Sequence, residues 1–461
     1  TYIQPRAYAL CDPRALHVHH FKKETYMKIR FVILLTLLLM RPSFGQGLRF
    51  SEVVETALRN NYQINIARIE RDRAANQNRP GNAGFLPTVD AVAFQQGAIR
   101  NTQQEFLDGR ELTRDGAQST DLNANIELEW TFFDGFRMFA RRDELEALEI
   151  LGNQSLRAQM EVTLLELASV YFGLVEEESL LQNYRQNLQT TRERYRILET
   201  GLDVGARSGL EVRQAYIDVL SDSIRVAEQE ARIYNLRQDL AFLSGDSLMA
   251  AQAIYQDPEL NPGLSMDSLR SALLRLNVQI LQARSQVNIA EAQKKQARSE
   301  FLPSLDLYGN YGLLRSQNEA GFLSSNLSTG PTVGIRLRFN LFNGFNDRMA
   351  VRDRELLIQG SEIALKQARE SSMTSLRQSY RTYTTAIEIL KMETQALEEA
   401  RKVVDIGLEQ LELGLINSLD FRQLQLVLIS SQQRFHIAEF NAKIAEIQLR
   451  ILSGELSFAL L

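Results

Sequence analysis

The sequence predicts a mainly α-helical fold of long coiled-coil helices, in which each chain also supplies four strands to a transmembrane β-barrel. Three observations predict it: the chain repeats itself once, each repeat has a segment of alternating apolar and polar residues, and each repeat has a long proline-free stretch with a heptad pattern. We expect an N-terminal extension and signal peptide at 1–45, a first repeat at 48–257 and a second at 264–461. Each repeat is expected to run helix, β-hairpin, long helix, helix.

The N-terminal segment has the pattern of an export signal. Two basic residues precede an apolar run at 31–40, and Ser-Phe-Gly at 43–45 has the small residues of a signal-peptidase site. A run of about ten apolar residues is too short for a transmembrane helix, which needs about twenty. We therefore expect translation to start at Met27 and the exported chain to begin near Gln46.

Export changes the composition in ways that exclude several functions. Without residues 1–45 the chain carries 45 basic and 55 acidic side chains, a net charge of −10, which disfavours nucleic acid as a partner. The same cleavage removes the only cysteine and three of the four histidines, Cys11, His17, His19 and His20. Disulfides, cysteine nucleophiles and histidine triads are excluded, and a lipid anchor on an N-terminal cysteine is disfavoured. We expect no enzyme activity, no cofactor and no metal site, and we expect the remaining His436 to face water.

Two tandem copies of one unit account for almost the whole exported chain. Ala-Leu-Arg-Asn-Asn-Tyr-Gln-Ile at 57–64 matches Leu-Leu-Arg-Leu-Asn-Val-Gln-Ile at 273–280. Further pairs follow in the same order: Phe-Leu-Pro at 85 and 301, Phe-Asp-Gly-Phe at 133 and Phe-Asn-Gly-Phe at 342, Leu-Glu-Val-Arg-Gln at 210 and Leu-Asp-Phe-Arg-Gln at 419, and Leu-Ser-Gly at 243 and 452. The offset falls from 216 to 209 residues after Phe-Leu-Pro, so the second copy is shorter there. Repetition alone indicates a gene duplication and no function.

Each copy contains a segment that alternates between apolar and polar residues, as a strand with one dry and one wet face does. The apolar positions are Leu122, Ala124, Ile126, Leu128, Trp130 and Phe132 in copy one, and Val333, Ile335, Leu337, Phe339 and Leu341 in copy two. We expect partner strands at 88–94 and 305–308, with polar, glycine-rich loops at 95–120 and 312–331. The residues expected to line a pore from the wet face are Glu127, Glu129, Arg336 and Arg338, and the arginines are expected to make that lining locally basic.

Strands of about ten residues with alternating faces are typical of a transmembrane barrel with a wet interior. Four strands cannot close such a barrel, and a lipid bilayer permits no open edges. Closure therefore needs other chains, with eight strands from two copies or twelve from three. A small sheet with one face packed on helices explains the alternation equally well. The export signal and the long helices favour the barrel.

Long helices are predicted in both copies because no proline occurs between Pro87 and Pro258 or after Pro331. A helix over 136–200 would be about 97 Å long, and a return helix over 210–243 about 50 Å. Apolar residues recur at steps of three and four, as in a coiled-coil seam, at Met373, Leu376, Tyr380, Tyr383, Ile387, Leu390, Leu397, Val404, Leu408 and Leu411, and at Leu164, Leu167, Tyr171, Leu174, Leu181, Leu188, Tyr195 and Leu202. A soluble coiled-coil scaffold explains the helices too, but gives the hairpins no role.

In this order the motifs resemble those of the TolC-like outer-membrane efflux family, over essentially everything after about Leu48. The resemblance rests on the duplication, on the Phe-Leu-Pro and Phe-Asp-Gly-Phe motifs around each strand pair, and on the glycine turns at 204–211 and 413–420. It implies a homotrimer whose twelve-stranded outer-membrane barrel continues as an α-helical barrel across the periplasm. The implied partners are outer-membrane lipid, a periplasmic adaptor protein and, indirectly, an inner-membrane transporter, with no nucleic acid.

The resemblance also assigns a role to the two glycine turns. They match the helix–helix tips that dock the adaptor in the family, and the residues concerned are Val204, Gly205, Ala206, Leu413, Gly414 and Leu415. Glycine suits a turn where the backbone bends sharply or is approached closely. As a simpler alternative, each glycine only ends a helix.

Residues just after the turns match the place where the family narrows its tunnel. These are Glu211 and Asp420, with Gln214 and Gln423 in the next turn of helix. Three-fold symmetry would turn Asp420 into a ring of three carboxylates, which can filter cations or repel itself open. An acid near a helix start is also favoured by the helix dipole alone.

The chain departs from family members that lock the closed state with a tyrosine and an arginine. Leu411 and Ile416 occupy those positions here, and Arg213 and Arg422, beside the two acids, are expected to replace the missing contacts. The predicted function is an outer-membrane exit duct for small molecules, delivered by an inner-membrane pump and a periplasmic adaptor. Type I protein secretion, metal efflux and, from another class, an exported coiled-coil scaffold without a pore remain as alternatives.

Overall fold

A computed structural model describes residues 47–255, 260, 263–320 and 323–455. The predicted extension and signal peptide at 1–45 lie outside the described residues. Residues 47–49 and 253–255 belong to a small unit of their own, in which Leu48 and Ile254 form a parallel bridge. The backbone N–H of Leu48 donates to the carbonyl of Ala253 at 2.7 Å, and the N–H of Tyr255 donates to the carbonyl of Leu48 at 3.1 Å.

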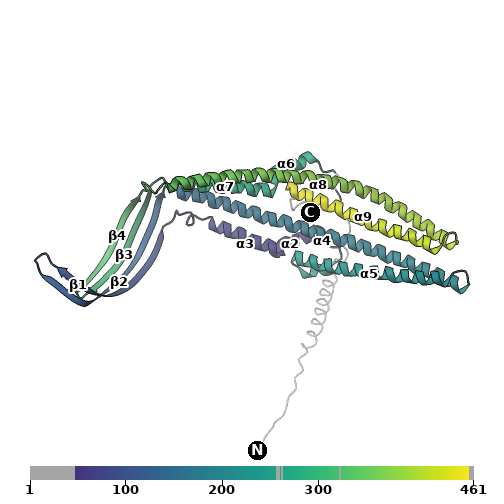
Figure 1. Ribbon diagram of the computed structural model, residues 1–461, viewed down its shortest axis with the longest axis horizontal. Coiled ribbons are helices and arrows are strands. Elements are labelled where there is room, and N and C mark those ends of the chain that lie inside the picture. The colour runs from purple at the N-terminus through teal and green to yellow at the C-terminus, as the bar shows by residue number, and fades with distance from the viewer. Residues whose placement is uncertain (1–46, 256–259, 261–262, 321–322, 456–461) are drawn as a thin grey trace, which may run out of the picture. The chain divides into compact units, whose positions relative to one another are not determined.

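The second unit holds the helices and strands, and its element order is the same in both halves of the chain (Figure 1). The first half runs α2 (Phe50–Asn60), α3 (Tyr62–Gln77), β1 (Thr88–Glu105), β2 (Glu111–Asp134), α4 (Arg137–Asp203) and α5 (Gly209–Ser244), followed by the short 3-10 helix η1 (Ser247–Ala251). The second half runs α6 (Met266–Leu276), α7 (Val278–Ser299), β3 (Ser304–Asn318), β4 (Ser325–Arg338), α8 (Asn346–Glu412) and α9 (Ser418–Ser453).

The repeated asparagine motif begins a helix and holds the end of another. Asn61 caps α3, because its Oδ1 accepts from a backbone N–H three residues later, and its Nδ2 donates to the carbonyl of Leu243 at 2.7 Å. Asn277 caps α7 in the same way and donates to the carbonyl of Leu452 at 2.9 Å. One amide side chain therefore joins the start of a helix to the carboxyl end of α5 or α9.

The repeated Leu-Ser-Gly motif is explained by the same junction. Gly245 ends α5 with φ +68°, and a Cβ added there would lie 2.7 Å from the carbonyl oxygen of Asn60. Gly454 ends α9 with φ +73°, and its Cβ would lie 2.7 Å from the carbonyl oxygen of Leu276. Both positions require glycine, for the left-handed backbone and for the close approach of another chain segment.

The Phe-Asp-Gly-Phe and Phe-Asn-Gly-Phe motifs make the transition from strand to long helix. Phe136 and Phe345 precede α4 and α8 with φ of 69° and 65°, a region that bulky residues rarely adopt. Each ring packs edge-on against the phenylalanine three residues earlier, with centroids 5.2 Å apart for Phe133 and 5.3 Å apart for Phe342. The aromatic pair holds a sharp turn that both copies repeat.

The four strands form one antiparallel sheet in the order β1-β2-β3-β4. The prediction of glycine-rich loops at 95–120 and 312–331 was wrong over most of its length. Only 106–110 separate β1 from β2, and only 319–324 separate β3 from β4. Their polar residues are strand because most of them pair through the backbone across the hairpin, as in Gln95↔Leu122 and Glu105↔Glu111. At its other end β4 is shorter than predicted. It ends at Arg338, so Phe339 and Leu341, which were expected within the strand, follow it.

The predicted helices are present, and the heptad positions form much of their buried surface. α4 and α8 have 67 residues each and α5 and α9 have 36 each, so the longer pair span about 100 Å. Buried heptad residues include Leu164, Leu167, Leu174, Leu376, Tyr383, Leu397, Val404 and Leu411, whereas Leu202 is exposed. One described helix, α4, contains a stretch apolar enough to cross a membrane, but half of that stretch is buried inside the protein.

Candidate functional site: the sheet faces and the helix tips

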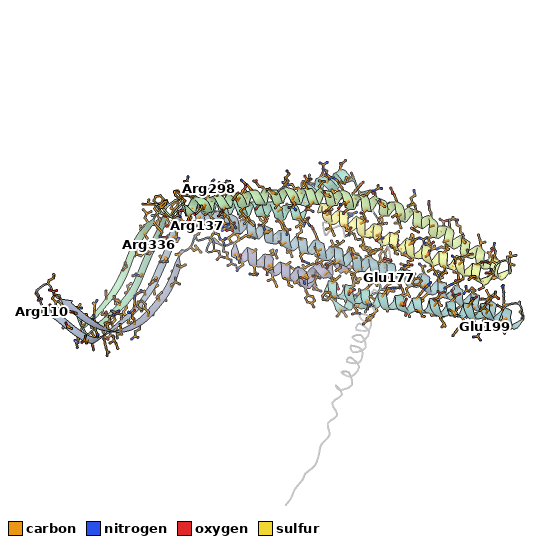
Figure 2. The ribbon with its side chains drawn as sticks, in the orientation of Figure 1. Arg110, Arg137, Glu177, Glu199, Arg298 and Arg336 are labelled. Carbon is orange, nitrogen blue, oxygen red and sulfur yellow. The ribbon has the colours of Figure 1, made fainter. Side chains whose placement is uncertain are left out.

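The strand register places the four predicted pore-lining residues on one face of the sheet. Glu127 pairs with Asp90 on β1 and Glu129 pairs with Tyr308 on β3. On β4, Arg336 pairs with Asp306 and Arg338 pairs with Ser304; Figure 2 labels Arg336 on its strand. Directly paired residues of an antiparallel sheet share a face, so all of these side chains lie on the same side.

This polar face is of mixed charge, which corrects the expectation that the arginines make it locally basic. Asp306 lies directly beside Arg336 and accepts a hydrogen bond from Thr131 Oγ1 at 2.7 Å. Asp90, Glu127 and Glu129 lie in the next rows of the same face. The sequence pattern shows which residues alternate within a strand, but the neighbours across strands depend on register.

The opposite face of the sheet is apolar and uncovered. Trp130, Leu307 and Ile335 form one row across β2, β3 and β4. The Ile335 side chain is 67% exposed, and the same face carries Val333, Leu337 and Tyr311, all exposed. Large uncovered apolar surfaces are rare on soluble monomers and indicate contact with lipid or protein.

The first predicted tip is a five-residue turn between α4 and α5. Gly205 has φ +76°, and its N–H donates to the carbonyl of Leu202 at 2.9 Å. Val204 is 75% exposed, and a Cβ added to Gly205 would meet nothing within 4 Å. Glycine is thus needed here for backbone conformation, while the space around the turn is open.

The second tip, between α8 and α9, has the same construction. Gly414 has φ +71°, and its N–H donates to the carbonyl of Leu411 at 3.1 Å. Leu413 and Leu415 are 74% and 71% exposed. Both turns connect the long helices at the ends farthest from the strands (Figure 1), and both present uncovered aliphatic side chains.

The two predicted gate acids have different surroundings. Glu211 forms a capping box with Ser208: its carboxylate accepts from the Ser208 N–H at 2.9 Å and the Ser208 hydroxyl at 3.1 Å. The hydrogen bond from the backbone of Ser208 holds the pKa of Glu211 below its usual value, and Arg207 at 4.0 Å adds to this. Asp420 is exposed, and Asn417 caps its backbone N–H at 2.9 Å. Among the described residues the Asp420 carboxylate has no hydrogen bond or ion pair.

Arg422 lies in a buried ion network that the sequence did not predict. Its Nη1 and Nη2 donate to Oδ2 and Oδ1 of Asp222, both at 2.9 Å. Thr191 donates to the same carboxylate at 2.7 Å, and Arg194, which is 1% exposed, pairs with Asp218. Arg422 was expected to replace the contacts of the missing closed-state lock; the acids that it pairs with, Asp222 and Asp218, lie on α5. Arg213, its counterpart in copy one, is exposed. The sequence repeat alone therefore did not indicate that one arginine is buried and the other is not.

The network links the two repeats, since Thr191 and Asp222 belong to copy one and Arg422 to copy two. Burial opposes the charged form of Asp222, but the hydrogen bonds from Arg422 and Thr191 outweigh it and hold the pKa of that carboxyl below its usual value. Burial likewise opposes the charge of Arg422, yet Asp222 raises its pKa. Each partner keeps the other ionised.

Further polar contacts continue along the seam between α4 and α9. Asn187 donates to Gln432 Oε1 at 2.8 Å, and Asn183 lies 3.0 Å from His436 Nε2. His436 was expected to face water, but its side chain is only 14% exposed. Together with the Arg422 network these contacts form what we call the polar seam.

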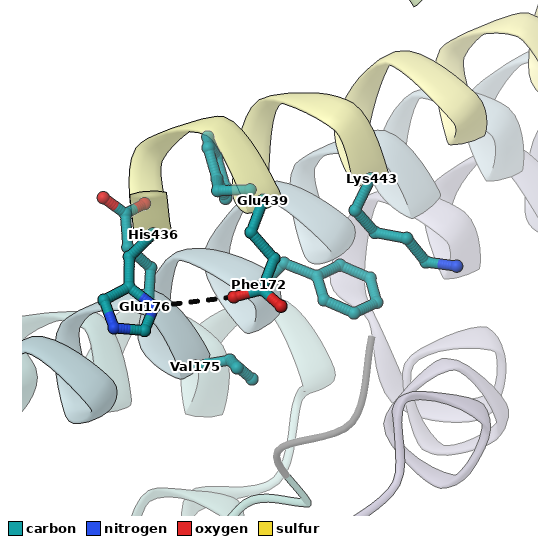
Figure 3. A pocket seen from close by; sticks show the side chains of 7 residues that line it. Phe172, Val175, Glu176, His436, Glu439 and Lys443 are labelled. Atoms are coloured by element: carbon teal, nitrogen blue, oxygen red, sulfur yellow. Dashed lines mark ion pairs between the residues drawn. The ribbon is translucent and has the colours of Figure 1, made fainter. Parts of the chain in front are cut away.

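The polar seam ends in a small cavity that holds two carboxylates (Figure 3). Glu176 on α4 lines it with His436, Glu439 and Lys443 on α9, and His436 Nδ1 lies 3.5 Å from Glu439 Oε2. Burial, followed by the neighbouring charge of Glu177, raises the pKa of Glu176 to about 7. This carboxyl therefore changes charge near neutral pH.

Comparison with known proteins agrees with this architecture. A model of the outer membrane efflux protein family matches residues 53–246 and 269–455. The alkaline protease secretion protein AprF of Pseudomonas aeruginosa is 23% identical over 92% of this chain and 87% of its own length. The outer membrane protein TolC of Escherichia coli is 21% identical over 90% of this chain and 84% of its own length.

Solved structures show the same fold. The CmeC outer membrane channel of Campylobacter jejuni superposes with a TM-score of 0.71 at 18% identity, over 88% of this chain and 85% of CmeC. The outer membrane protein VceC of Vibrio cholerae gives 0.70 at 17% identity, over 88% and 96%. The resemblance predicted from the motifs is confirmed, and with it the combination of long helices and four strands per chain. The chain belongs to the outer membrane efflux protein family, whose members are outer-membrane channel proteins.

Proposed function

We propose that three copies of this chain form an outer-membrane duct, with twelve strands in the membrane and the helices in the periplasm. The observation that carries this proposal is the sheet itself. It has one uncovered apolar face, one polar face, and open edges at β1 and β4. A bilayer accepts strands only in a closed barrel, so the edges must pair with those of other copies. The apolar face then meets lipid and the polar face lines the channel.

The helix tips are the proposed docking site for a periplasmic adaptor protein, through which an inner-membrane pump would deliver cargo. The residues are Val204, Gly205, Ala206, Leu413, Gly414 and Leu415. Exposed aliphatic side chains beside a positive-φ glycine support this, because another backbone can approach such a turn closely. In this scheme the pump supplies the energy and the present chain catalyses no reaction.

Asp420 is the proposed principal residue of the pore constriction, and Glu211, Gln214 and Gln423 are proposed as further residues of the same constriction. The Asp420 side chain is exposed near the start of α9, so three-fold symmetry would assemble a carboxylate ring there. The Glu211 carboxylate is already used as a helix cap. We therefore assign the filter to Asp420 and a mainly structural role to Glu211.

Small molecules are the proposed cargo, and secretion of a protein is the second candidate. The second candidate is favoured by two relatives, whose names are alkaline protease secretion protein AprF and proteases secretion protein PrtF. AprF and PrtF are each 23% identical to this chain, and TolC is 21% identical. The three are thus about equally distant from it in sequence. Export assays with a dye and with a secreted protease would distinguish the two.

Planar bilayer recordings of the purified protein test the duct and its filter together. We expect discrete channels with a preference for cations, and a weaker preference in Asp420→Asn, because the ring loses its charge. Glu228→Gln, an exposed acid on α5, is the matched control and should leave the preference unchanged. Channels that Asp420→Asn does not alter would reject the filter, and the absence of channels from a folded oligomer would reject the duct.

A further inference from the structure

Two glycines on the polar face of the sheet lie underneath side chains from the neighbouring strand. A Cβ added to Gly334 would lie 2.4 Å from both Cζ and the hydroxyl oxygen of Tyr308, its cross-strand partner. A Cβ added to Gly312 would lie 2.1 Å from Oδ1 of Asn125, again its cross-strand partner. In both pairs the side chain occupies the space that any other residue would fill.

Tyr308 consequently lies flat on the sheet and does not project from it. Although the polar face is uncovered in the single chain, Tyr308 is half-buried, whereas Tyr311 on the opposite face of the same strand is 63% exposed. The Arg336 guanidinium lies over the Tyr308 ring, 5.1 Å from its centroid. The ring is thus held between the glycine below it and the guanidinium above it.

We infer that Gly334, through Tyr308, sets the free cross-section of the channel at this level of the barrel, which makes it a positioning residue for cargo passage. This inference rests on the proposed function, in which the polar face lines the lumen. A tyrosine lying flat adds little to the thickness of the wall. A tyrosine that stands up from each of three chains would narrow the lumen with three rings at one height.

The distances around Gly334 also predict the effect of a substitution there. The atoms that a Cβ at Gly334 would meet are the far end of the Tyr308 side chain, which can rotate about its side-chain torsions without moving the strands. Because the sheet lies beneath the ring, we expect the displaced ring to move away from the sheet and toward the lumen. Gly309 provides a matched control on the opposite face of β3, because its Cβ would find only ordinary contacts at 3.6 and 3.8 Å.

The test uses a thiol reporter beyond the proposed constriction. The only natural cysteine is Cys11, within the expected signal region, so Ser304→Cys supplies a single reactive site. Ser304 pairs with Arg338 at the end of the sheet that adjoins the helices. A reagent that enters from the hairpin ends of the strands must therefore pass Tyr308, four residues away, before it reaches Ser304. Intact cells are treated with a maleimide carried on polyethylene glycol, and separately with a small thiol reagent that reports intrinsic reactivity.

We expect Gly334→Ala to slow labelling by the bulky reagent several-fold and to leave labelling by the small reagent unchanged. Gly309→Ala should label like the parent with both reagents. In a Tyr308→Ala background, Gly334→Ala should have no effect, since the ring is absent. Tyr308→Ala alone should label at close to the parental rate, because a flat ring does not obstruct.

Several results would overturn the inference. Gly334→Ala labelling at the parental rate would show that the ring does not reach the lumen. Slowing that persists without Tyr308 would show that the ring is not the cause. A several-fold gain in Tyr308→Ala alone, which is informative even if Gly334→Ala fails to assemble, would show that the ring already obstructs. Failure of the parent to label with either reagent would instead reject the polar face as the lumen, and with it the proposed duct.

Discussion

The two helix seams in which α9 takes part differ in polarity. The seam between α8 and α9 is apolar, with a buried cluster of Leu397, Ala400, Val404, Leu411, Phe421 and Leu428. The polar seam between α4 and α9 contains Asn183, Asn187, Thr191, Arg422, Gln432 and His436. An apolar seam gains free energy from any close packing, whereas polar partners must meet in one register. We infer that the first seam holds a repeat together and the second fixes how the two repeats align.

The largest predicted effect comes from removing one partner of the buried pair. Arg422→Met leaves the buried Asp222 carboxyl without its two hydrogen bonds from the guanidinium, which should lower the free energy of unfolding by about 3–5 kcal/mol. Denaturant titration of the detergent-extracted protein measures it. The double variant Arg422→Met/Asp222→Leu should recover much of the loss, since the buried carboxyl is then removed with its partner and only the partly exposed Arg225 loses an ion pair. Losses that simply add would show that the pair is not coupled.

A cavity in the apolar seam should lower the free energy of unfolding by a similar amount or slightly less. Leu411 is fully buried in the α8–α9 cluster, so Leu411→Ala should cost about 2–5 kcal/mol through lost burial and a cavity. This loss should be the same at low and at high salt. The same denaturant titration in both salts checks the contrast, and a strong salt dependence would argue against a purely apolar seam.

The polar seam should also respond to pH through Glu176. Its pKa of about 7 in the folded chain lies above the value of 4.5 for an unperturbed glutamate, so the folded state holds the proton longer than the unfolded state. Stability should therefore fall as pH rises from about 4.5 to about 7. Glu176→Gln removes this dependence and, after allowance for the partial solvent exposure of the side chain, should stabilise the protein by about 1–2 kcal/mol at pH 8.

Melting temperatures between pH 5 and pH 8 measure the effect of Glu176. The charged and titratable groups around it are Glu177 on its own helix and His436, Glu439 and Lys443 on α9. Glu166→Gln, at an exposed position ten residues earlier on α4, is the matched control and should keep the parental profile. Identical pH profiles for Glu176→Gln and the parent would contradict the prediction.

The smallest effect is expected outside both seams, at the first helix tip. Ser208→Ala removes the capping box with Glu211 and should cost about 1 kcal/mol. Most of that loss should be local, so hydrogen exchange at the first turn of α5 measures it better than global unfolding. Unchanged protection of those amides would show that the cap contributes little.

The sequence predicted the apolar seam and the sheet faces, because apolar spacing reports directly on burial. Leu397, Val404 and Leu411 follow the heptad and are buried, and Ile335 and Arg336 lie on opposite faces as the alternation requires. Strand length was underestimated because polar residues in 95–105 and 111–120 are paired through their backbone, which leaves no trace in a hydropathy pattern.

The polar seam was not predicted because a polar residue on a long helix is usually solvated. Nothing local distinguishes Arg422, which is buried, from Arg213, which is exposed at the matching position. Its partner Asp222 lies 200 residues away, and the contact exists only once the two repeats are packed together. Gly334 was part of the expected alternation, but its role depends on Tyr308 across the strand.

The central claim is that three chains close one barrel, and native mass spectrometry of the detergent-extracted protein tests it most directly. We expect a single assembly of three copies, because the outer edges of β1 and β4 have no strand partner among the described residues and the proposed twelve strands need three chains. A stable assembly of two copies would imply an eight-stranded barrel and no three-fold ring at Asp420. A monomer that stays folded and soluble without detergent would contradict the duct altogether.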